Sequence, residues 1–192
     1  QKDEARELAE KMVLASQFAQ ADPYRAATHN KGIFNGIDAL LIATGNDWRA
    51  IEAGAHAYAS HDGVYRGLSR WTMDLKTEEL IGEMTMPMPV ATKGGSIGLN
   101  PRVVLSHELL GYPSAKELAQ IIVSIGLAQN FAALKALVST GIQHGHMKLQ
   151  AKSLALLAGA TEAEVPKLVE SLIAEKTFNL EKAQTLLKNL RS

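Results

Sequence analysis

The sequence has no cysteine, few aromatic residues and no excess of either charge. Without cysteine the chain cannot form disulfides, thiolate nucleophiles or cysteine-ligated zinc sites, and nothing indicates an oxidising compartment. Its 20 basic and 20 acidic side chains leave no net field to attract a nucleic acid or an anionic membrane surface. We therefore expect a cytoplasmic protein that binds neither nucleic acid nor membrane.

Long apolar runs are also missing. The run at residues 39–43 is far shorter than the roughly 20 residues that a membrane-spanning helix needs, and the charged opening of the chain is not typical of a signal peptide. The 192 residues, 46% of them hydrophobic, are enough for one large domain, or for one domain and a small appendage. Because the chain starts within helix-period sequence and without methionine, we expect it to be part of a longer protein.

Hydrophobic periodicity predicts a helix-rich first part. Apolar residues recur every three to four positions over residues 4–20, which predicts a helix followed by a loop at residues 22–25. The composition of residues 30–59 predicts two buried helices, the second of which starts at or beside Asp47. A strand at residues 38–43 is the alternative.

The pattern changes after these helices. Alternation within residues 67–92 predicts an antiparallel β-hairpin. Residues 93–98 are rich in glycine, which could indicate a phosphate-binding loop or a tight turn. We predict a tight turn, because their glycine spacing matches no nucleotide-binding motif. A capping box formed by Ser114 and Glu117 predicts the start of the longest helix. Residues 141–192 predict a small helical module that could move as a lid.

The stretch around Lys31 and Asp47 mixes charged and amide side chains with small apolar ones, which is typical of a functional site. A partly buried Lys31 could stabilise a developing oxyanion, but a lysine at this position could also extend into water. Asp47 could pair with Lys31 through tertiary structure, or it could be an ordinary helix cap.

The histidines do not suggest a metal site. His144 and His146 are two residues apart, so on a helix they point in different directions and make a poor pair of ligands. A single histidine in a mobile segment suits a proton donor instead. We interpret four further histidines as structural, namely His29, His56, His61 and His107.

Five stretches resemble the bacterial, class II 3-hydroxy-3-methylglutaryl-CoA reductases, namely residues 22–33, 43–50, 83–90, 126–130 and 141–147. The resemblance covers nearly the whole chain. It implies an α+β fold, in which residues 1–140 are the remainder of a large, helix-rich substrate-binding and dimerisation domain with an antiparallel hairpin. Residues 141–192 would be the small, mobile, all-α C-terminal flap.

The same resemblance implies an activity. Family members reduce the thioester of hydroxymethylglutaryl-CoA to mevalonate and free CoA, with two hydrides from NADPH or NADH and no metal. The dinucleotide would be bound mainly by a domain that this chain lacks. The enzyme would be a homodimer, or a higher oligomer, with its active site at the subunit boundary.

The resemblance also implies roles for individual residues. Lys31 would be the cation beside the thioester oxygen, Asp47 the carboxylate that holds and tunes it, and His146 the proton donor to the departing thiolate. Arg25 would bind the terminal carboxylate of the substrate. Its polar neighbours in substrate binding would be Thr28, Asn35 and Gln129.

Two departures qualify this picture. Many relatives carry a second histidine four residues after the catalytic one, where this chain has Gln150. The family's catalytic glutamate and its dinucleotide-binding domain lie upstream of the first helix, so we expect a C-terminal half that is inactive alone. The alternative from another class is a non-catalytic CoA-ligand-binding or helical interaction module.

Overall fold

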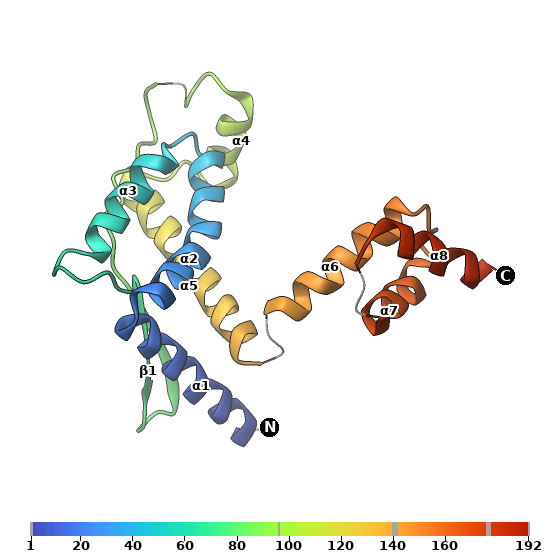
Figure 1. Ribbon diagram of the computed structural model, residues 1–192. Helices are drawn as coiled ribbons and strands as arrows, with labels where there is room; N and C mark the ends of the chain where they lie inside the picture. The colour runs from blue at the N-terminus through green and yellow to red at the C-terminus, as the bar shows by residue number, and fades with distance from the viewer. Residues whose placement is uncertain (1, 96, 140–141, 176–177, 192) are drawn as a thin grey trace. The chain divides into compact units, whose positions relative to one another are not determined.

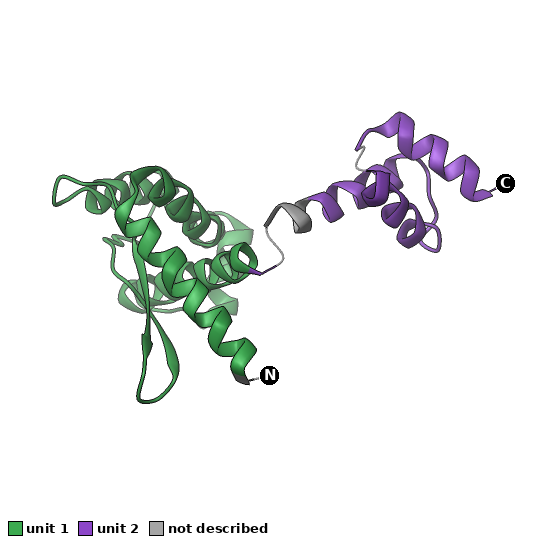
Figure 2. Cartoon of the chain, turned by 60° about the horizontal axis from the view of Figure 1, so that its bottom comes forward, with its two compact units in different colours: residues 1–138 green, residues 139–192 purple. Residues whose placement is uncertain are grey.

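The computed structural model describes residues 2–95, 97–139, 142–175 and 178–191, with the backbone only for Lys2 and residues 142–146. Within these residues it contains eight α-helices and one two-stranded antiparallel sheet, which confirms the predicted helix-rich α+β class (Figure 1). The chain divides into two compact units, Gln1–Val138 and Ser139–Ser192 (Figure 2). The sequence placed this boundary at residue 140, and the roles it gave to the two parts stay predictions.

The first unit begins with three helices. They are α1 (Lys2–Ala21), α2 (Pro23–Ala43) and α3 (Trp48–Ala59). The predicted loop at residues 22–25 is wrong, because Asp22 caps α2 and its carboxylate accepts the Arg25 N–H at 2.7 Å. Pro23 suits the first helical position, where no N–H donor is needed, so α2 starts at once. The alternative of a strand at residues 38–43 is also wrong, since these residues form the last turns of α2.

The predicted hairpin is confirmed but is shorter than expected. Strands β1 (Ser69–Asp74) and β2 (Glu79–Met84) pair antiparallel in register, from Ser69 opposite Met84 to Asp74 opposite Glu79. Residues 85–92 were predicted to continue the hairpin but belong to neither strand. Pro87 and Pro89 lack the N–H donors that a strand ladder requires.

Two helices complete the first unit, α4 (Pro101–Leu109) and α5 (Ala115–Val138). The capping box before α5 is present as predicted: Ser114 N–H donates to the Glu117 carboxylate at 2.7 Å, and Glu117 N–H donates to Ser114 Oγ at 3.3 Å. The core of the unit forms where α2 packs against α5 and α3. Its fully buried members include Ile33, Ile37, Leu41, Leu118 and Ile122.

Helix α5 is long and apolar enough to span a membrane by length and composition alone, which the sequence pattern did not predict. This is weak evidence, because the core helix of a soluble protein passes the same test. One side of α5 is buried in the unit, and it includes the polar Asn130, which is 1% exposed.

The second unit is helical in its described residues. It contains α6 (Ile142–Leu157), α7 (Val165–Glu175) and α8 (Leu180–Arg191) around a core that includes Leu168, Leu172 and Leu187. Arg191 donates to both carboxylate oxygens of Glu164, at 2.8 and 2.9 Å, and to the Gly159 carbonyl at 3.0 Å. This ion pair lowers the pKa of Glu164 to about 2 and fixes the end of α8 to the turn between α6 and α7.

Candidate functional site

One side of α2 carries four of the residues to which the resemblance gives roles. Arg25, Thr28, Lys31 and Asn35 follow one another at intervals of three or four residues, which places them along one face of a helix. Thr28, Lys31 and Asn35 are exposed, and Arg25 is half-buried. The opposite face packs into the core. α2 therefore presents a polar row of side chains on a rigid, buried support.

Arg25 and Thr28 are in direct contact. Arg25 Nη1 donates to Thr28 Oγ1 at 2.8 Å, and Thr28 Oγ1 donates to the Arg25 carbonyl at 3.0 Å. Burial lowers the pKa of Arg25 from its usual value. Among the described residues no carboxylate lies within ion-pair distance of this guanidinium. A half-buried cation without an acidic partner is a suitable binding group for an anionic ligand.

Gln129 of α5 lies beside this row. A Cβ atom placed on Gly36, the residue after Asn35, would approach Gln129 Cβ to 3.2 Å. The helices also meet at Gly126, where a Cβ atom would lie only 2.7 Å from Ile37 Cδ1. Glycine on both helices therefore allows a close approach that brings the Gln129 backbone next to the polar row.

The structure does not bring Lys31 and Asp47 together within one chain. Lys31 precedes the end of α2, at Ala43, by 43 − 31 = 12 residues. At 1.5 Å of rise per residue, Lys31 lies about 18 Å from that end of the helix. Asp47 lies beyond that end, too far away for the two side chains to meet.

Asp47 is the N-cap of α3, which was one of its two predicted roles. Its Oδ1 accepts the N–H groups of Arg49 and Ala50 at 3.1 and 3.3 Å, and Arg49 Nε lies 3.4 Å away. The hydrogen bond from Ala50 is the largest cause of a pKa below the usual value for Asp47. The carboxylate remains exposed and charged, so it is still able to meet a second cation.

His146 lies in α6, but its side chain is outside the described part of the structure. Its predicted role as proton donor stays a prediction.

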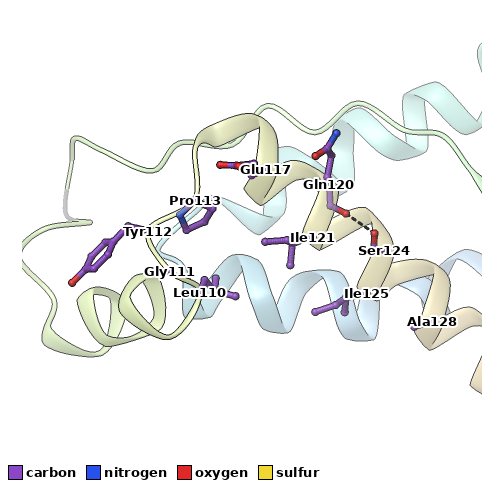
Figure 3. A pocket seen from close by; sticks show the side chains of 10 residues that line it. All are labelled: Leu110, Gly111, Tyr112, Pro113, Glu117, Gln120, Ile121, Ser124, Ile125 and Ala128. Carbon is purple, nitrogen blue, oxygen red and sulfur yellow. Dashed lines mark hydrogen bonds between the residues drawn. The ribbon is translucent and has the colours of Figure 1, made fainter.

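A groove of about 700 Å³ runs along α5, at a position that the sequence did not suggest (Figure 3). Its lining includes the apolar Leu110 and Ile121 and the polar Glu117 and Ser124. It does not contain the row on α2. It reaches Ala128, however, and so ends next to Gln129 in the sequence of α5.

Two further groups were missed by the sequence pattern. His29, interpreted only as structural, belongs to a buried polar cluster with Ser69 and Asn130. Burial, and then the nearby Glu52 carboxyl of α3, raise the pKa of Asp38 to about 6. The only feature of the sequence that could have indicated Asp38 was its position as a single carboxyl within the apolar end of α2.

Comparison with known proteins decides the family. Residues 1–151 match the family model described as hydroxymethylglutaryl-coenzyme A reductase. The chain belongs to this reductase family. It is 50% identical over 186 residues to the 3-hydroxy-3-methylglutaryl-coenzyme A reductase of Archaeoglobus fulgidus, covering 97% of this chain and 42% of that protein. It is 40% identical over 195 residues to a probable reductase of the same name from Borreliella burgdorferi, covering 99% of this chain and 44% of that protein.

Solved reductases from Streptococcus pneumoniae are similar to the chain in both sequence and structure. One is 83% identical with a TM-score of 0.73, covering 99% of this chain and 45% of that chain. A second, a class II reductase bound to NADPH in open conformations, is 83% identical with a TM-score of 0.72. The match covers 100% of this chain and 46% of that chain. The chain thus spans less than half the length of the reductases it matches.

Proposed function

We propose that this chain forms the substrate-binding part of an enzyme that reduces hydroxymethylglutaryl-CoA to mevalonate and free CoA. The observation that carries the proposal is Arg25, a half-buried guanidinium with no acidic partner among the described residues, at one end of a polar row on α2. A planar guanidinium can bind a carboxylate through two hydrogen bonds. The carboxylate of the substrate would bind here, and its thioester would lie further along α2.

Lys31 would act on the reacting carbonyl. Each hydride that reaches the carbonyl carbon leaves negative charge on its oxygen, and a fixed ammonium group stabilises that charge. Lys31 follows Arg25 by about 1.7 helical turns, so the monothioester of a short dicarboxylic acid could reach both residues. Asn35 and Gln129 would donate hydrogen bonds at the thioester end.

His146 would complete the first half of the reaction. When the hemithioacetal collapses, the C–S bond breaks and the electron pair leaves with sulfur as a thiolate. A thiol has a pKa near 8.5, so a proton from an imidazole makes its departure effectively irreversible. The aldehyde that remains accepts the second hydride and a proton to give the alcohol.

NADPH or NADH would supply the two hydrides. The described residues do not contain the pyrophosphate-binding pattern of a glycine-rich turn between a strand and a helix. The described glycines of the predicted turn, Gly94, Gly95 and Gly98, follow an irregular segment and not a strand. We therefore assign dinucleotide binding to parts of the enzyme outside this chain.

A second copy of the chain would supply Asp47. Lys31 lies about 18 Å from the end of α2 that precedes Asp47 in the same copy, whereas a symmetric dimer could place the exposed Asp47 of one copy against the exposed Lys31 of the other. We therefore infer a homodimer with its active site at the subunit boundary, as the resemblance implies.

The experiment is complementation in the complete enzyme. Lys31→Ala and Asp47→Asn should each reduce kcat by orders of magnitude in homodimers, while CoA binding persists. When the two variants are mixed, half of the dimers combine both chains and each has one intact site, so about one quarter of wild-type activity should return. Retained turnover by Lys31→Ala would refute the catalytic role, and a non-catalytic binding module would show only weaker affinity. Failure of complementation would refute the shared site.

A further inference from the structure

A cluster of buried polar side chains joins α2, β1 and α5 beneath the polar row. His29 Nε2 lies 2.7 Å from Ser69 Oγ, and Ser69 Oγ donates to Asn130 Oδ1 at 2.8 Å. Trp71 Nε1 donates to the same Asn130 oxygen at 2.7 Å. His29, Ser69 and Asn130 are 2%, 1% and 1% exposed, so the cluster is closed to solvent.

The three side chains also contact one another in a closed set. His29 Nε2 lies 2.7 Å from Ser69 Oγ and 3.3 Å from Asn130 Nδ2, and Ser69 Oγ donates to Asn130 Oδ1. Burial is the largest cause that lowers the pKa of His29, to about 4, so the imidazole is neutral near pH 7. No charge from this ring competes with Arg25, one turn earlier on α2.

The cluster lies directly behind the proposed ligand contacts. His29 follows Thr28 on α2, and Asn130 follows Gln129 on α5. On each helix a buried member of the cluster is therefore the sequence neighbour of a less buried residue with a proposed ligand contact. Ser69 comes from a different element, β1, and ties the two together. A change in this cluster can rotate either helix and move its outward neighbour.

We propose that the cluster of His29, Ser69 and Asn130 is a positioning device that fixes Arg25 and Gln129 for the carboxylate-bearing substrate. None of the three touches the substrate. They act by holding the rotation of α2 relative to α5, and this inference rests on the proposed reductase function. The expected effect is on substrate binding, because Arg25 grips the carboxylate, which is the non-reacting end of the substrate, and Gln129 binds the thioester end without transferring a proton or a hydride.

The chain offers a matched control for the test. Ser16 is also 1% exposed, and its Oγ accepts the Trp71 N–H at 2.9 Å. It lies on α1 and binds the backbone of β1, so Ser16→Ala removes a buried hydroxyl of the same kind without touching the contact between α2 and α5.

Ser69→Ala and Ser16→Ala should be compared in the complete enzyme, by thermal unfolding and by steady-state kinetics with hydroxymethylglutaryl-CoA. Both should lower Tm. Only Ser69→Ala should raise KM, by roughly five- to tenfold, with kcat changed by less than about twofold. In an Arg25→Lys background, Ser69→Ala should raise KM by less than about twofold, because the residue being positioned is already altered.

Equal effects of the two serine variants on KM would overturn the inference, as would a KM effect that is fully additive with Arg25→Lys. If Ser69→Ala does not fold, Ser69→Cys and Ser16→Cys keep the shape of the side chain, weaken the hydrogen bonds and give the same comparison. If the wild-type enzyme does not reduce hydroxymethylglutaryl-CoA, the proposed function fails. If it does, and the serine variants behave alike, only the positioning role fails.

Discussion

Three glycines at the contact between α2 and α5 should respond differently to the same added methyl group. At Gly32 the nearest atom to a new Cβ is Ala133 Cβ, at 3.8 Å, which is an ordinary contact. At Gly126 the new Cβ would lie 2.7 Å from Ile37 Cδ1, closer than real Cβ atoms approach. Gly36 is intermediate, with its closest contact at 3.1 Å. The same substitution thus probes how closely the two helices pack at three levels.

The magnitudes follow from two opposing effects. Alanine is favoured over glycine in a helix interior by about 1 kcal/mol, so Gly32→Ala should raise the free energy of unfolding by about that amount. Gly126→Ala gains the same preference, but overpacking costs about 1–3 kcal/mol. Ile37 is fully buried and has little room to move, so the cost should lie in the upper part of this range, at about 2–3 kcal/mol, and the net result should be a loss of about 1–2 kcal/mol. Gly36→Ala should lie between the two.

Tryptophan fluorescence can follow the first unit alone, because both tryptophans, Trp48 and Trp71, lie within it. The thermal midpoint of Gly126→Ala should be roughly 5–10 °C below that of Gly32→Ala. If Gly126→Ala unfolds at the same temperature as Gly32→Ala or higher, the close packing of α2 on α5 described here is wrong.

Two further predictions concern pH. Because the pKa of Asp38 is raised to about 6 in the folded protein, the protonated carboxyl stabilises the fold below about pH 4. This contribution is lost as pH rises through about 6. Asp38→Asn should therefore gain about 1 kcal/mol relative to wild type between pH 4 and pH 8 in thermal unfolding, after allowance for solvent screening. Burial, and then Arg25, lower the pKa of His29 to about 4, so its contribution to stability is present above about pH 6.5 and is lost as pH falls through about 4. An NMR titration should find this imidazole neutral at pH 5, and a midpoint near 6.5 would contradict its burial.

Local features of the fold could be predicted because neighbouring residues determine them. The cap at Asp47 and the box formed by Ser114 and Glu117 involve side chains that bind backbone groups two or three positions away. The alternation of the hairpin is likewise a property of a short segment. The predicted loop at residues 22–25 is wrong, because a proline both ends a preceding helix and suits the first position of the next, and Pro23 does the latter.

The buried polar cluster could not be predicted, because its members are distant in the sequence. His29 and Ser69 are 40 residues apart, and Ser69 and Asn130 are 61 apart. Nothing local distinguishes a buried serine that joins two helices from one on the surface. The resemblance gave predicted roles to the residues of the row on α2, but it contained no information on which side chains support that row from behind.

Adjacent residues of α2 show why ligand contacts and fold stability can change independently in this chain. Asn30 is fully buried: its Nδ2 donates to Tyr65 Oη and to the Arg66 carbonyl at 3.0 and 2.9 Å, and its Oδ1 accepts the Leu68 N–H at 2.8 Å. Lys31, the next residue, is exposed. Consecutive side chains on a helix point about 100° apart, so one of this pair holds the loop before β1 while the other faces the proposed ligand. Substitution at Asn30 leaves buried groups of the loop unpaired and lowers stability, whereas substitution at Lys31 removes a charge from the surface and leaves every described contact of the core in place.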